Sequence, residues 1–193
     1  MKINPLEILL NQNYNFNKKF YFISGNEKTL MEKINYKIIQ NYKRVEKVTV
    51  ERLDSILDYV DEIGLFENKK IFLVKNCSSL DEKTLNKIRE SESVFIFAQE
   101  NSPKIKKIKN IFIKDKDTYL FDCYELDRAS KIKLLNEFIR LSEINFGKNL
   151  YWFLVEKLDS RYVFFENSLN KILELEQKEI TLNNIKKILT IND

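Results

Sequence analysis

The run Phe20-Tyr21-Phe22-Ile23-Ser24-Gly25 (residues 20–25) decides the fold most clearly. It is apolar and aromatic almost throughout and ends at a glycine, which predicts a buried β-strand followed by a turn. The runs Lys70–Lys75 (KIFLVK) and Ser93–Ala98 (SVFIFA) predict two more buried strands, and Tyr119–Tyr124 (YLFDCY) predicts a last one. Continuous apolar runs of this kind are typical of strands covered on both faces, as in a parallel sheet.

Helical periodicity separates these strands. Apolar residues recur at helical spacing in Glu27–Tyr42, Glu51–Ile63 and Asp81–Glu90, so each segment predicts a helix. Val45–Val50 is rich in β-branched residues and predicts a further strand. Strands that alternate with helices predict a three-layer α/β domain with a mainly parallel sheet.

The pattern changes after Glu125, because no strand signal follows. Four segments have helical periodicity: Arg128–Leu141, Leu150–Leu158, Tyr162–Leu175 and Leu182–Leu189. Asp127 and Thr181 stand where helix N-caps belong. We therefore predict two domains, an α/β domain over 1–125 and a small all-α domain over 126–193.

The composition argues against several classes of function. Among 193 residues there is no histidine, which removes histidine-based nucleophile and acid–base chemistry and most zinc sites. Cys77 and Cys123 lie far apart without C-x-x-C spacing and are expected to be reduced thiols. Neither a signal peptide nor a membrane span is visible, so we expect a cytoplasmic protein without membrane contact, metal or cofactor.

The turn after the first strand is where an α/β domain of this layout would bind nucleotide phosphates. It reads Ser24-Gly25-Asn26-Glu27-Lys28-Thr29. A phosphate loop needs several residues between two glycines, then Lys and Ser/Thr. Here the loop is short, the second glycine is missing, and Glu27 places a negative charge where phosphate would lie. We predict no ATP hydrolysis by this chain.

Four segments resemble the bacterial DNA polymerase III delta subunit, a clamp-loader family. They are Tyr21–Glu27, Ile63–Asn76, Glu166–Ile172 and Ile180–Ile185, and they occur in the family's order across nearly the whole chain. The resemblance implies an AAA+-like α/β domain without a working phosphate loop, followed by a helical lid domain.

The resemblance also implies a function, which is to bind the sliding clamp and help to open it during DNA replication without hydrolysing ATP. The family's leucine-phenylalanine pair, which inserts into a hydrophobic pocket of the clamp, corresponds to Leu65 and Phe66, with Ile63 as a supporting contact. A Leu and a Phe framed by Gly64 and polar residues would suit an apolar anchor with a polar rim. Alternatively, the pair packs beneath its own domain as the chain turns into the next strand.

The other implied partners are the remaining clamp-loader subunits. The family's delta subunit continues into a third, helical collar domain that holds the loader together, whereas this sequence stops at Asp193. We expect either a shortened piece or a reduced protein, with weakened assembly into a loader and with clamp binding retained.

Two further features have a functional and a simpler interpretation. Within the basic stretch Lys104–Lys116, four lysines are candidates for DNA contact: Lys104, Lys106, Lys107 and Lys109. The simpler interpretation, a solvated lysine-rich loop or strand edge, is favoured. Aromatic residues around Trp152 are expected to form the core of the second domain. The alternative functions are a nucleic-acid-binding α/β protein unrelated to clamp loading and a degenerate nucleotide-binding enzyme.

Overall fold

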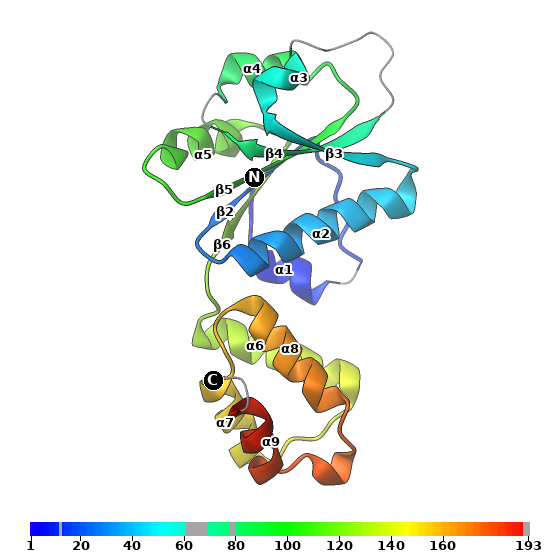
Figure 1. The fold of residues 1–193 in the computed structure, drawn as a ribbon, viewed down its shortest axis with the longest axis vertical. Coiled ribbons are helices and arrows are strands. Elements are labelled where there is room, and N and C mark those ends of the chain that lie inside the picture. The colour runs from blue at the N-terminus through cyan, green and yellow to red at the C-terminus, as the bar shows by residue number, and fades with distance from the viewer. Residues whose placement is uncertain (12, 61–68, 78–79, 191–193) are drawn as a thin grey trace. The chain divides into compact units, whose positions relative to one another are not determined.

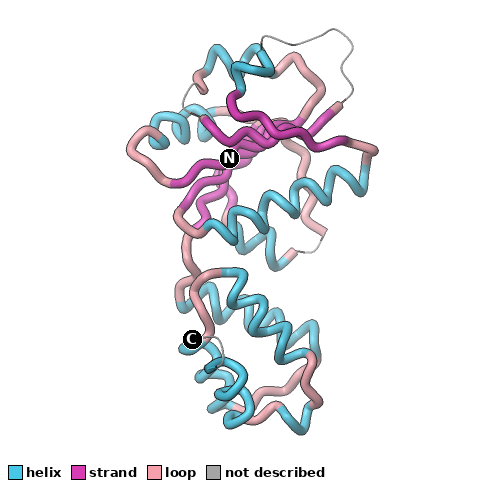
Figure 2. The backbone as a smooth tube through the Cα atoms, in the orientation of Figure 1, coloured by secondary structure: helices cyan, strands magenta, loops and turns pink. Residues whose placement is uncertain are grey.

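The computed structural model describes residues 1–11, 13–60, 69–77 and 80–190. The chain divides into two compact units, Met1–Tyr124 and Glu125–Asp193. The first unit contains all the strands of the described chain, and the second is helical (Figures 1 and 2).

The first unit is built on a six-stranded sheet with the order β1-β6-β2-β5-β4-β3. The strands are β1 Lys2–Ile3, β2 Phe20–Gly25, β3 Thr49–Ser55, β4 Lys70–Asn76, β5 Val94–Glu100 and β6 Thr118–Cys123. Each pair of neighbours runs parallel. The predicted parallel α/β fold is confirmed.

Helices cover both faces of this sheet (Figure 1). On one face lie α1 Pro5–Leu10 and α2 Lys28–Val45, and on the other lie α3 Ile56–Val60, α4 Glu82–Ile88 and α5 Ile105–Lys114. A sheet covered on both faces needs apolar residues on both sides of its central strands, and every residue of β2 is buried.

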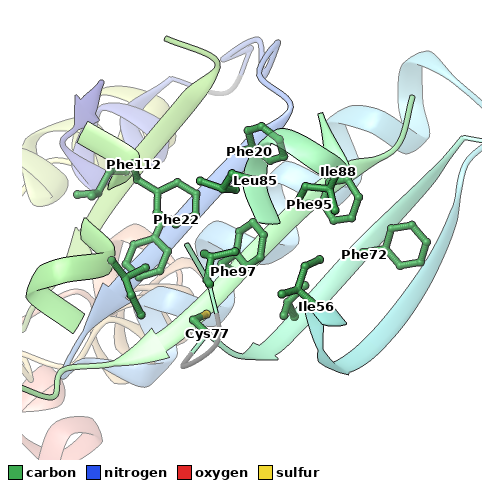
Figure 3. Packing of buried hydrophobic residues seen from close by; sticks show 14 of the residues in the cluster. Phe20, Phe22, Ile56, Phe72, Cys77, Leu85, Ile88, Phe95, Phe97 and Phe112 are labelled. Carbon is green, nitrogen blue, oxygen red and sulfur yellow. The ribbon is translucent and has the colours of Figure 1, made fainter. Parts of the chain in front are cut away.

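The side chains of β2 alternate between the two layers. Phe22 stacks on Phe112 of α5, with ring centroids 4.6 Å apart, in a cluster that α3 and α4 also join (Figure 3). Tyr21 points to the other layer, where its hydroxyl lies 2.9 Å from that of Tyr42 in α2. The central strand therefore joins both helical layers.

The second unit contains α6 Arg128–Ser142, α7 Lys148–Lys157, α8 Tyr162–Leu173, a 3₁₀ turn Gln177–Glu179 and α9 Leu182–Thr190. The predicted N-caps form. The amide of Ser130 donates to Asp127 Oδ1 at 2.7 Å, and that of Asn184 donates to Thr181 Oγ1 at 3.3 Å. Buried Leu154, Phe165 and Ile172 form part of its core.

Two predicted elements between α2 and β4 are wrong. The strand predicted over Val45–Val50 begins only at Thr49, because α2 continues to Val45. The helix predicted over Glu51–Ile63 begins only at Ile56, because residues 51–55 belong to β3. This edge strand is polar and largely exposed, so its strand state comes from pairing with β4 rather than from local propensity.

The basic stretch is also corrected, since most of it forms helix α5 instead of a loop or strand edge. Ile105, Ile108 and Phe112 are buried at the spacing of one helix face. The expectation of an aromatic core around Trp152 holds only in part. Phe165 and Tyr162 are buried, whereas Trp152 and Phe164 are exposed and lie beside Arg128 and Arg161.

Truncating Phe22 tests the importance of the core that joins β2 to α5. We expect Phe22→Ala to lower the free energy of unfolding by about 3–5 kcal/mol, because it leaves a cavity between Phe112 and the sheet. Tyr36→Ala, on the exposed face of α2, is the control and should change it by less than about 0.5 kcal/mol. Urea denaturation followed by circular dichroism measures both, and equal losses would contradict the packing described.

Candidate functional site

The turn after β2 is shaped by a close approach of two backbone segments. Gly25 has φ +154°, and a Cβ atom placed on it would lie 1.7 Å from the carbonyl oxygen of Cys123 in β6. That same oxygen accepts hydrogen bonds from the amides of Asn26 at 3.1 Å and Glu27 at 3.2 Å. Only glycine fits at position 25, and the turn is held against the end of β6.

The first turn of α2 is capped by a carboxylate from the chain itself. Glu27, which is 4% exposed, accepts hydrogen bonds from the amide of Thr29 at 3.1 Å and from that of Leu30 at 2.6 Å. The Thr29 hydroxyl also donates to both carboxylate oxygens, at 2.8 and 2.9 Å. A negative group at this position is further stabilised by the helix dipole.

This arrangement occupies the place that a nucleotide phosphate takes in a phosphate loop. Four amide N–H groups of the turn and first helical turn, those of residues 26, 27, 29 and 30, donate within the protein. Lys28, at the position of a phosphate-binding lysine, lies 2.9 Å from Glu100 instead. The Glu27 carboxylate therefore lies against the amides at the start of α2.

Asp122, next to this turn in β6, is the centre of a small polar network. Its carboxylate lies 2.7 Å from the Lys109 ammonium and 2.9 Å from that of Lys2, and it accepts a hydrogen bond from Ser24 Oγ at 3.1 Å. Burial disfavours the Asp122 carboxylate, but the hydrogen bonds from Lys109 and Lys2 outweigh burial and lower its pKa. The network ties β1, β2, β6 and α5 together.

The two cysteines are poor candidates for nucleophiles. Cys77 and Cys123 are both free and buried, and burial raises the pKa of the Cys77 thiol to about 12 and that of Cys123 further. Thiols with raised pKa are poor nucleophiles at neutral pH. Over the described residues no group of three or more acidic, histidine or cysteine side chains could hold a metal ion.

The predicted clamp-binding residues Ile63, Leu65 and Phe66 lie outside the described residues. The elements on either side of residues 61–68 are well anchored. In α3, Ile56 is buried and the hydroxyl of Tyr59 lies 2.8 Å from Ser91 Oγ. After the segment, Lys69 pairs with Glu46 at 2.7 Å at the start of β4.

The candidate DNA-contacting lysines differ in their surroundings. Lys104, Lys106 and Lys107 are exposed, whereas the side chain of Lys109 is only 17% exposed and pairs with Asp122. Sequence reasoning missed the capping role of Glu27 and the network at Asp122. The first has a local signal, a carboxylate two and three residues before the amides it caps. The second joins residues from three strands and a helix and has no local signal.

No protein-family model matches the chain. An uncharacterised protein of Methanocaldococcus jannaschii is 25% identical over 179 residues, covering 82% of this chain and 36% of that protein. In the described part of the chain, no helix is long and apolar enough to cross a membrane.

Two solved structures resemble the fold of this chain. The DNA clamp loader delta protein of Bacillus subtilis superposes with a TM-score of 0.63 at 16% identity, covering 95% of this chain and 61% of that one. Domain III of the Thermotoga maritima replication initiation protein DnaA gives 0.51 at 14% identity, covering 97% and 88%. This chain thus spans about three fifths of the clamp loader delta protein and about a third of the archaeal relative.

At these identities the likeness shows the fold. The chain has an AAA+-like α/β fold followed by a small all-α unit, as predicted. Its solved structural neighbours include proteins of DNA replication.

Replacing Glu27 tests whether its carboxylate caps α2. We expect Glu27→Ala to lower the free energy of unfolding by about 1–2 kcal/mol, because the amides of Thr29 and Leu30 lose a buried acceptor. Glu27→Gln keeps an oxygen acceptor and should lose less. Urea denaturation measures both variants, and a Glu27→Ala protein as stable as the wild type would show that the cap is not stabilising.

Proposed function

We propose that the chain is a non-catalytic clamp-loader subunit that binds the sliding clamp during DNA replication. The observation that carries the proposal is an AAA+-like fold whose phosphate position is filled by its own Glu27 carboxylate. A protein of this fold that cannot cradle a nucleotide would act by binding rather than by hydrolysis. The likeness to a clamp loader delta protein over 95% of the chain supports this choice.

Leu65 and Phe66 are the proposed anchor residues, with Ile63 in support. The assignment rests on the resemblance of Ile63–Asn76 to the clamp-binding turn and following strand of the delta family. On either side of this segment, Ile56 and Tyr59 of α3 are buried and β4 pairs in parallel with β3 and β5. The other partners proposed are the remaining clamp-loader subunits.

The double variant Leu65→Ala/Phe66→Ala tests the anchor. We expect a loss of clamp affinity of about 2 kcal/mol or more, close to 30-fold in Kd, because apolar anchor residues dominate such interfaces. The matched control is Leu141→Ala/Phe164→Ala, which removes an exposed Leu and an exposed Phe from the second unit. Titration against the purified sliding clamp measures both.

The result that would end this proposal is a wild-type chain that does not bind the clamp. Clamp affinity that is unchanged in Leu65→Ala/Phe66→Ala, in a protein with an unchanged circular dichroism spectrum, would remove these two residues from the interface. Equal losses in the control would show that the effect is not local to the proposed anchor.

Nucleotide binding is the second test of the proposal. Titration with a fluorescent ATP analogue should give no saturable signal. The reason is that the amides that would hold the phosphates donate hydrogen bonds to the Glu27 carboxylate instead. A working AAA+ ATPase is the positive control, and phosphate release assays on the same samples should show no turnover above buffer. Saturable binding of one nucleotide per chain would contradict the non-catalytic assignment.

A further inference from the structure

The positive charge of this chain is concentrated in one short segment. The chain has 33 basic and 29 acidic residues, a net charge of +4. Residues 102–117 contain six lysines and two aspartates, which is also a net +4, so the rest of the chain is balanced. The six lysines are Lys104, Lys106, Lys107, Lys109, Lys114 and Lys116.

The fold leaves most of this charge without a partner. The two aspartates of the segment, Asp115 and Asp117, both pair with Arg89 rather than with the lysines. Lys109 pairs with Asp122. The other five lysines are exposed and have no acidic partner within hydrogen-bonding distance anywhere in the described chain. The positive end of the helix dipole, at Lys104–Lys107, adds to this potential.

Helix α5 is amphipathic, and most of its lysines lie on the outer face. Ile105, Ile108 and Phe112 are buried against the sheet, and the 100° turn per residue places Lys106, Lys107 and Lys114 on the opposite side. The helix rise separates Lys107 from Lys114 by about 10 Å along the axis, close to three base-pair steps of a duplex. The side chains therefore form a line of positive charge that is fixed by the core.

We infer that this α5 lysine face, formed by Lys106, Lys107 and Lys114 with Lys104 and Lys116 just beyond the two ends of the helix, binds the phosphate backbone of DNA without reading its sequence. Lysines contact phosphates as point charges, and this face has no arginine to recognise a base edge in bidentate fashion. The only aromatic residue of α5, Phe112, is buried on the opposite face and cannot stack on a base. Contacts to the backbone are what such a surface offers.

Two other polyanionic partners fit this face less well. Protein interfaces are enriched in Tyr, Trp and Arg and depleted in Lys, which is the reverse of the α5 lysine face. Membrane-surface helices insert an apolar face into the lipid, whereas the apolar face of α5 packs on the sheet. A line of lysines over a buried apolar stripe therefore favours nucleic acid.

The test compares two triple variants that remove equal charge from exposed helical positions. Lys106→Gln/Lys107→Gln/Lys114→Gln removes the centre of the face, and Lys43→Gln/Lys83→Gln/Lys87→Gln removes exposed lysines from α2 and α4. Binding to a fluorescein-labelled DNA duplex is followed by anisotropy from about 50 to about 200 mM salt. This measurement needs no sliding clamp, so its failure and the failure of clamp binding are distinguishable.

We expect the wild type and the α2/α4 variant to bind the duplex with an affinity that falls steeply with salt. The α5 variant should bind at least about tenfold more weakly at low salt, and its log–log salt slope should be shallower by about 2–3, since each lost phosphate contact removes about 0.9. Absence of wild-type binding, or equal weakening in both variants, would overturn the proposal. So would tighter binding to poly-glutamate than to DNA at matched charge, which would indicate an acidic protein partner.

Discussion

The backbone of Gly25 passes that of Cys123 with no space for a side chain, and the structure at the carboxyl end of β2 depends on this approach. Because of this approach, the carbonyl oxygen of Cys123 accepts hydrogen bonds from the amides of Asn26 and Glu27. These bonds turn the chain from β2 directly into α2. Glu27 then stands at the start of the helix, where its carboxylate receives the next free amides. A longer loop would have left those amides open to an external anion.

The turn after β2 is closed by hydrogen bonds within the chain. An AAA+-like sheet holds its phosphate site at the carboxyl end of its first core strand, and here that end is satisfied internally. The closed turn does not weaken the sheet, because β2 is buried and pairs with a strand on each side. Under the proposed function, the scaffold acts through binding residues at its surface and not through a nucleotide site.

Sequence reasoning succeeded where the structural cause is local. The buried strands, helix α2 and the N-caps Asp127 and Thr181 follow from apolar periodicity and from side chains bonded to amides two or three residues away. It failed at β3, since residues 49–55 are polar and become a strand only through β4. It also took the lysines of α5 as the dominant signal, whereas Ile105, Ile108 and Phe112 set the conformation. The approach of Gly25 to Cys123 joins residues 98 positions apart, and only the folded chain reveals it.

The distribution of charge bears on why α5 is lysine-rich at all. Several basic side chains elsewhere in the first unit have acidic partners, as Lys28 has Glu100 and Lys70 has Glu51. A helix that packs through three apolar residues needs no charge of one sign on its outer face, and mixed charges would serve solubility equally well. Repulsion between neighbouring lysines instead costs some helix stability. An outer face that carries uncompensated charge of a single sign is therefore better explained by an anionic partner than by the requirements of the fold.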